Sequence, residues 1–101
     1  MHERRKGVII AVDFDDTLQI AGKPNLPLFQ SLIAQQRQGC AIILNTCRQG
    51  KRLDEAVVFC IKNGLRFNAI NSNIPQIVKR FGYDPRKIFA DVYIDDKAIK
   101  P

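Results

Sequence analysis

The sequence has few of the residues from which several common kinds of site are built. Its three cysteines, Cys40, Cys47 and Cys60, are odd in number and form no C-x-x-C pair, which argues against a disulfide framework and a zinc site. A single histidine, His2, lies in a polar terminal stretch, so a serine or cysteine triad would lack its base. No glycine-rich phosphate or dinucleotide loop occurs either.

Long hydrophobic runs are absent as well. The longest apolar runs, residues 8–12 and 41–44, are far too short to span a bilayer, and no signal-peptide pattern opens the chain. Together with the cysteine pattern, this predicts a protein of the reducing cytoplasm that has no membrane partner.

The apolar content of the chain suits one small packed domain. The 101 residues are 46% hydrophobic and 26% charged, so we expect a single domain over residues 1–101. Lysine and arginine number 16 against 10 acidic residues, and the net charge of +6 favours anionic partners such as nucleotides, nucleic acid or phosphorylated molecules. The basic residues are spread along the chain, which favours a solvated surface over an RNA-binding platform.

Short apolar blocks alternate with helical patterns. Residues 8–12, 41–44, 67–70 and 88–94 are typical of strands, and the first two of strands buried on both faces, as in a parallel sheet. Three stripes at helical spacing lie between them, and we expect the helices to end at Gly39, Gly64 and Gly82. Asp54 and Glu55 are expected in the first turn of the second helix, and Pro75 at the start of the third. The stripes consist of Leu28, Phe29, Leu32, Ile33 and Gln36, then Leu53, Ala56, Val57, Cys60 and Ile61, then Ile74, Ile77, Val78 and Phe81.

This β-α-β-α-β-α-β order predicts the fold class. Short right-handed crossovers give an α/β, three-layer, Rossmann-like fold, with a small parallel sheet and helices on both faces. Ligands of such folds bind outside the carboxyl ends of the strands. Five carboxylates follow the first and last predicted strands and should meet at this edge: Asp13, Asp15, Asp16, Asp95 and Asp96.

A cluster of like charges calls for a cation. Hard oxygen ligands at an open edge suit Mg²⁺, which keeps part of its water and is completed by phosphate oxygens, so Mg²⁺ is the expected cofactor. Any one of these aspartates alone would be explained equally well as a helix N-cap or a solvated turn residue.

The segment VDFDDTL, residues 12–18, resembles the first motif of the haloacid dehalogenase superfamily, a hydrophobic strand followed by D-x-D-x-T-L or D-x-D-x-T-V. Thr46 resembles the hydroxyl residue of the second motif, Lys87 stands where the lysine of the third could fall with Lys79 as a competitor, and Asp95-Asp96 resembles the acidic fourth motif. The likeness runs from about residue 8 to residue 96.

The resemblance implies a Mg²⁺-dependent phosphomonoester hydrolase that works through an aspartyl-phosphate. Asp13 would attack phosphorus, and Asp15 would protonate the leaving oxygen and then activate water. Mg²⁺ would be held by Asp13, the main-chain carbonyl of Asp15 and Asp95, with Asp96 as a further or indirect ligand. Thr46 and Lys87 would stabilise the phosphoryl oxygens; alternatively, Thr46 caps the following helix and Lys87 is a solvated surface lysine.

The substrate is less closely defined. Residues expected beside it are Phe14, Asp16, Thr17, Cys47 and Arg48. Asp16 replaces a usual glycine, a variant that resembles 5′-deoxyribonucleotidase-like and small members of the superfamily. Only a short flap between Thr17 and Leu28 stands where many members carry a cap domain, and the chain ends five residues after Asp96, before a further helix and strand that many members have. An uncapped crevice admits a nucleotide, a nucleic-acid end or another large phosphorylated molecule, unless a second copy in a homo-oligomer closes over a smaller one.

Two other classes of protein remain as alternatives. A receiver-like module phosphorylated on aspartate uses an acidic pair, a threonine and a lysine, but carries its acceptor on a later strand than the pair. A non-catalytic phosphate-binding protein would be expected to have lost one of the acids, and both Asp13 and Asp15 are present.

Overall fold

The protein is built on one mixed sheet whose centre is the first strand. A computed structural model describes residues 7–85, 87–97 and 99–100. The central strand β1 (Ile9–Val12) is buried along its whole length and pairs in parallel with a strand on each side. The order across the sheet is β5 (Ala69–Ile70), β4 (Ala41–Leu44), β1, β6 (Val92–Ile94) and β7 (Ile99–Lys100), and β7 alone is antiparallel.

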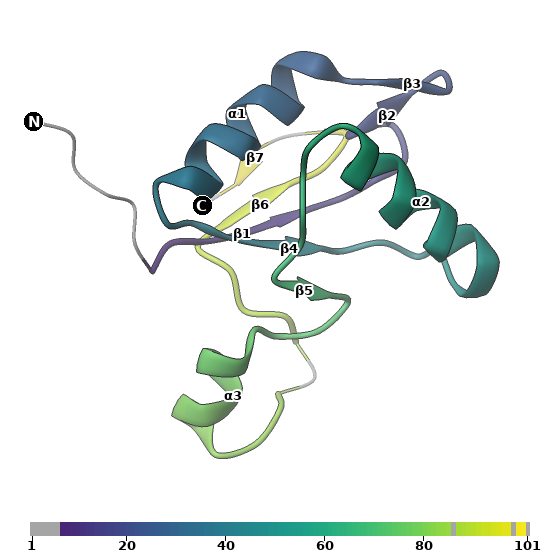
Figure 1. The fold of residues 1–101 in the computed structure, drawn as a ribbon. Coiled ribbons are helices and arrows are strands. Elements are labelled where there is room, and N and C mark those ends of the chain that lie inside the picture. Colours follow the sequence, from purple (N-terminus) through teal and green to yellow (C-terminus); the bar gives the residue numbers. More distant parts are fainter. Residues whose placement is uncertain (1–6, 86, 98, 101) are drawn as a thin grey trace, which may run out of the picture.

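Helices cover both faces of this sheet. Helices α1 (Leu26–Arg37) and α2 (Gly50–Lys62) lie on one face, and α3 (Pro75–Phe81) lies on the other (Figure 1). Alternate residues of β1 serve the two cores: Ile10 and Val12 pack with buried residues of α1 and α2, whereas Ile9 and Ala11 pack with Ile77 of α3. The predicted three-layer, Rossmann-like α/β fold is confirmed.

Most of the helix ends lie at or next to the residues that the sequence predicts. Pro75 is the first residue of α3, as predicted, and Gly82 ends that helix with a left-handed φ of +79°. Gly39 and Gly64 also have positive φ, but each follows the capping residue by one position, since Gln38 caps α1 and Asn63 caps α2.

Some sequence expectations were wrong. Helix α2 begins at Gly50, so Asp54 and Glu55 lie in its second turn and not in its first. Ile61 and Phe81, assigned to the buried stripes, are 44% and 48% exposed. Beyond β6 the sheet has the additional strand β7, which the sequence did not reveal.

Two strands are shorter than predicted, and side-chain hydrogen bonds lie where each strand is lost. Residues 67–70 reduce to β5: the Asn68 N–H donates to Ile42 O at 2.8 Å, but the Asn68 side chain, and not a main-chain carbonyl, accepts from Ile42 N at 2.8 Å. Residues 88–94 reduce to β6, since the Tyr93 hydroxyl donates to Ile88 O (2.7 Å) and accepts from Ala90 N (3.1 Å), holding this segment as a loop.

The predicted flap is a small hairpin. Strands β2 (Gln19–Ile20) and β3 (Lys23–Pro24) pair with each other and not with the main sheet. The Asn25 amide Nδ2 ties the base of the hairpin to Thr17 O at 3.0 Å. In the described part of the chain no inserted domain covers the carboxyl edge of the sheet, and no helix has the length and apolarity needed to cross a bilayer.

The strand order locates the crevice. From β1 the chain moves outward through β4 to β5 on one side and then returns across β1 to β6 on the other. The direction of winding therefore reverses between β1 and β6, and ligands of open α/β sheets bind at the carboxyl ends of such a pair.

Candidate active site

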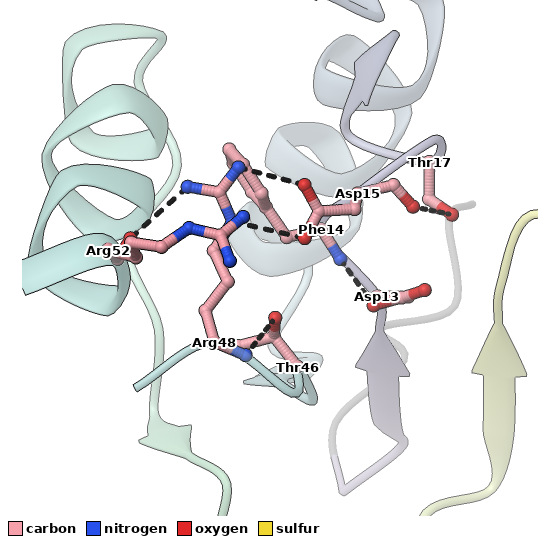
Figure 2. Close-up of polar contacts among 7 residues, drawn as sticks. All are labelled: Asp13, Phe14, Asp15, Thr17, Thr46, Arg48 and Arg52. Carbon is pink, nitrogen blue, oxygen red and sulfur yellow. Dashed lines mark hydrogen bonds and ion pairs between the residues drawn. The ribbon is translucent and has the colours of Figure 1, made fainter. Parts of the chain in front are cut away.

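Asp13 is the first residue beyond the carboxyl end of β1. Its main-chain N–H donates to Ile94 O at 2.9 Å, which fixes the residue against β6, and its Oδ1 accepts from Phe14 N at 2.8 Å (Figure 2). Among the described residues no hydrogen bond reaches Oδ2. Burial raises the pKa of Asp13, against the Phe14 hydrogen bond, and the negative charges of Asp15, Asp96 and Asp95 raise it further. Asp13 thus has one oxygen held by Phe14 N, one oxygen that accepts no hydrogen bond from the described residues, and other acids near it.

Asp15 differs because a cation is paired with it. Arg48 donates from Nη2 to Oδ1 (2.8 Å) and from Nε to Oδ2 (3.0 Å), the bidentate arrangement that guanidinium and carboxylate favour (Figure 2). These hydrogen bonds hold the pKa of Asp15 below its usual range, and its side chain is 48% exposed. Asp15 is therefore ionised and partly solvated, and while Arg48 is bound its lowered pKa makes it a weaker proton acceptor.

Arg48 is itself held from several sides. Its guanidinium carbon lies 4.7 Å from the centre of the Phe14 ring, and Nη1 donates to Arg52 O at 3.2 Å. The hydrogen bond to Asp15 raises the pKa of Arg48 still further. The guanidinium is a fixed positive charge above the loop that follows β1.

Thr46 lies two residues beyond β4 and is buried. Its N–H donates to the Asn71 side chain at 2.7 Å, and its hydroxyl accepts from Arg48 N at 3.2 Å. The alternative that Thr46 caps α2 is wrong, since Gln49 is the capping residue. The hydroxyl instead shapes the loop that carries Arg48.

A cavity of about 290 Å³ joins these elements at the carboxyl edge. Asp13 and Asp95 line it from β1 and β6, and Thr46 and Cys47 line it from the loop after β4. A larger cavity, of about 720 Å³, opens at the opposite edge beside α3, but no acidic residue lines it. We place the candidate active site in the smaller cavity because the carboxylates are there.

The residues present fit a Mg²⁺ ion that is held by only a few protein ligands. In residues 7–85, 87–97 and 99–100 no three acidic, histidine or cysteine side chains form a ready-made metal cluster. Mg²⁺ needs only one or two carboxylates when water and phosphate complete its shell, and Asp13 and Asp95 share one cavity. The main-chain carbonyl of Asp15 accepts only a long hydrogen bond, 3.5 Å, from the Thr17 hydroxyl. Asp96 is exposed and does not line the cavity, so its contribution is its charge near Asp13.

The other residues predicted beside the substrate take different places. The Phe14 ring is fully buried, 5.6 Å from the Phe59 ring, and supports Arg48 from below. Thr17 is buried in the turn, and Asp16 is exposed with a left-handed φ of +59°. Of the five residues predicted beside the substrate, Cys47 alone lines the cavity, and Arg48 is bound to Asp15.

The lysine remains a prediction. Lys87 and Lys79 are both exposed, and within the described residues no hydrogen bond or ion pair joins either ammonium group to Asp13. The main chain at Lys87 is held firmly, since its carbonyl accepts from the buried Asn73 amide at 3.2 Å. His2 lies outside the described residues.

Two asparagines to which sequence reasoning gave no role organise this edge. Asn71 binds Thr46 N, and Asn73 donates to Pro85 O and Lys87 O and accepts from Phe89 N at 2.6 Å. Their signal was present: both follow a predicted strand at the ligand-binding edge, and asparagine often bonds main-chain groups where a chain turns.

The fold recurs in a protein of known structure. A conserved protein from Bacteroides thetaiotaomicron is 35% identical over 89% of this chain and 76% of its own, with a TM-score of 0.75. The chain belongs to the same family as this Bacteroides protein. No protein-family model and no curated protein matches the chain. The Bacteroides relative confirms the α/β architecture of the chain.

Proposed function

We propose that the protein is a Mg²⁺-dependent phosphomonoester hydrolase, similar to small capless members of the haloacid dehalogenase superfamily. The observation that carries the proposal is Asp13: it lies at the topological switch point, offers Oδ2, and shares its cavity with Thr46 and Asp95.

Two displacements would make up the reaction. Asp13 Oδ2 attacks phosphorus, the bond from phosphorus to the ester oxygen breaks, and a proton from Asp15 goes to the leaving alcohol. Water then attacks the aspartyl-phosphate, Asp15 accepts its proton, and the bond from phosphorus to Asp13 breaks to release inorganic phosphate. Mg²⁺, held by Asp13 and Asp95, would neutralise the charge that otherwise keeps the carboxylate and the phosphoryl group apart.

Arg48 has a specific part in this scheme. In the free enzyme Nε and Nη2 donate to Asp15 and Nη1 donates to Arg52 O, so a dianionic phosphoryl group would compete with Asp15 for the same guanidinium. Transfer of Arg48 to the phosphoryl oxygens would release Asp15 and allow it to carry a proton. The Thr46 hydroxyl and, as a prediction, Lys87 add further stabilisation of those oxygens.

Substrate size follows from the small flap. The β2–β3 hairpin has two residues in each strand, so the crevice would admit a nucleotide, a nucleic-acid end or another large phosphorylated molecule. The net charge of +6 favours such anions, and a second copy of the chain could close over a smaller substrate. A cytoplasmic location fits a chain whose three cysteines are odd in number and form no C-x-x-C pair.

One observation favours a second candidate, a non-catalytic or receiver-like module that binds phosphate or carries it on aspartate. The bidentate pairing of Asp15 with Arg48 occupies the residue that turnover requires. Such a module would hold phosphate at Asp13 without the second displacement.

A phosphate-release panel tests both candidates. It would include p-nitrophenyl phosphate, nucleotides, sugar phosphates and oligonucleotides phosphorylated at the 3′ or 5′ end, each with Mg²⁺ and with a chelator. We expect release that needs both Mg²⁺ and Asp13. Release that persists with Asp13→Asn or in the chelator would refute the mechanism, and a stable beryllofluoride adduct without any turnover would favour the module.

A further inference from the structure

Strand β5 is flanked by two asparagines that make matching contacts. Asn68 precedes the strand, and its Oδ1 accepts from Ile42 N at 2.8 Å. Asn71 follows the strand, and its Oδ1 accepts from Thr46 N at 2.7 Å. The two amides thus hold the neighbouring chain segment at two points, one within β4 and one just beyond its end. Asn71 alone of the pair contacts a candidate site residue.

Asn71 is fixed through its main chain as well. Its N–H donates to Leu44 O at 2.8 Å, and its φ of +51° lies in the left-handed region, which asparagine tolerates better than most residues. Main chain and side chain therefore hold Asn71 against the segment that leaves β4.

Hydrogen bonds continue from Asn71 across the carboxyl edge. Thr46, which donates to Asn71, accepts from Arg48 N through its hydroxyl, and the Arg48 side chain binds both oxygens of Asp15. The sequence of contacts links the loops after β5, β4 and β1. A displaced Thr46 would therefore shift both the hydroxyl and the guanidinium assigned to the phosphoryl group.

We propose that Asn71 is a positioning residue of the candidate active site: its side-chain carbonyl fixes the main chain at Thr46 and thereby holds Thr46 and Arg48 in register with Asp13 and Asp15. Asn71 does not itself contact the reacting atoms. Its effect on catalysis rests on the proposed phosphatase function, whereas its effect on the loop does not.

The test compares Asn71→Gly with Asn68→Gly. Each removes one side-chain acceptor from the same pair of strands, and glycine accepts the positive φ at position 71. In Asn71→Gly, loss of a hydrogen bond should speed amide exchange at Thr46 about fivefold or more, since such a bond contributes about 1 kcal/mol. Alkylation of the exposed Cys47 by iodoacetamide should change as well. In Asn68→Gly, exchange should increase at Ile42 while Thr46 and Cys47 stay as in the wild type.

Catalysis gives the second readout. With p-nitrophenyl phosphate and Mg²⁺, kcat of Asn71→Gly should fall about 10- to 100-fold, the range expected when reacting groups are misplaced by an ångström or less. KM should change less than kcat, and Asn68→Gly should retain wild-type kcat. Asn71→Asp keeps an acceptor oxygen at the same reach and should restore the protection of the Thr46 amide.

Several outcomes would overturn the proposal. One is that the two glycine variants have the same rate of Thr46 amide exchange and the same rate of Cys47 alkylation. Another is that kcat falls equally in both glycine variants. A third is that the Thr46 amide is unprotected in folded Asn71→Asp. Should the wild type hydrolyse no phosphomonoester, the proposed function fails, while faster Thr46 exchange confined to Asn71→Gly still supports the positioning role. Should Asn71→Gly not fold, Asn71→Asp decides the matter through Thr46 exchange alone.

Discussion

The two ends of β1 each meet an aspartate, and the two carboxylates have different surroundings. At the amino end Asp91 accepts from Ile9 N through Oδ2 at 2.7 Å, and its own N–H donates to Ile9 O at 2.8 Å. At the carboxyl end Asp13 binds Ile94 O through its N–H, and its Oδ1 accepts from the adjacent Phe14 N. Each carboxylate thus gives one oxygen to a main-chain donor, but Asp91 ties β1 to a segment 82 residues away, whereas Asp13 lines a cavity and has other acids near it. An acid beside a central strand is thus assigned by its surroundings and not by its place alone.

Replacing Asp13 should give the largest effect. In Asp13→Asn the nucleophile is lost, and phosphate release should fall at least about 1,000-fold. The raised pKa means that the ionised carboxylate destabilises the fold as pH rises above the ordinary carboxyl range, so the variant should have a higher Tm than the wild type at pH 7. Steady-state kinetics measures the loss of phosphate release, and thermal melts measure the change in Tm. A lower Tm for Asp13→Asn would contradict the contrast between the two ends of β1.

Removing Arg48 should give the next largest effect. In Arg48→Met the pKa of Asp15 should rise toward its ordinary range, and kcat/KM should fall about 100-fold, as for other lost oxyanion contacts. Because the wild-type pKa of Asp15 is lowered, the ion pair adds stability at neutral pH that disappears as pH falls through that pKa. Carbon-13 NMR titration of the carboxyl groups follows this directly.

Arg52→Met is the matched control for Arg48. The charge of Arg52 also lowers the pKa of Asp15, but Arg52 makes no hydrogen bond to it. Its removal should move the pKa of Asp15 less than Arg48→Met does. Equal shifts would show that net charge, and not the bidentate contact, holds Asp15 ionised.

Replacing Asp91 should lower stability and leave activity unchanged, the opposite of what we expect for Asp13. Asp91→Ala leaves Ile9 N–H without its acceptor and should lower the free energy of unfolding by about 1 to 3 kcal/mol, with kcat unchanged. For a domain of this size that corresponds to a fall in Tm of about 4 to 8 °C per kcal/mol. Asp91→Asn retains an acceptor oxygen and should recover most of the loss. An active-site role would appear as lowered kcat in both variants.

The last prediction concerns the accessibility of the three thiols and requires no substitution. Cys47 is exposed at the carboxyl edge, whereas Cys40 and Cys60 are buried, and burial raises the pKa of the Cys60 thiol to about 12. We expect iodoacetamide at pH 8 to modify one thiol in the native protein and three after unfolding, as read by mass spectrometry. Rapid native labelling of Cys60 would mean that the α2 face opens far more readily than its packing indicates.

The sequence predicted the parts of the fold that depend on hydrophobic burial. The blocks at 8–12 and 41–44 are apolar because both faces are covered, so their pattern is sufficient, and β1 and β4 lie where it indicates. Strand lengths at 67–70 and 88–94 were wrong because Asn68 and Tyr93 form hydrogen bonds that hydrophobicity does not report.

The candidate site was predictable in location and less so in detail. Asp13, Thr46 and Asp95 share a cavity because strand ends of a parallel sheet share an edge. That Arg48 pairs with Asp15, and that the Phe14 ring is turned into the core, depends on side-chain directions in two loops 33 residues apart. The place of Lys87 depends on the Asn73 contacts in the same way.

The pairing of β1 with β6 also has a consequence for the order of assembly. Ile10 and Val12 are partners of Val92 and Ile94, so the middle strand of the sheet keeps an open edge while the ribosome adds some 80 residues. During that time Asp13 N–H has no Ile94 O to bind, and the acids at 95 and 96 have not been made. Synthesis therefore supplies the second neighbour of β1 and the later acids of the crevice at the same stage, and any partial chain that stops before residue 92 lacks both.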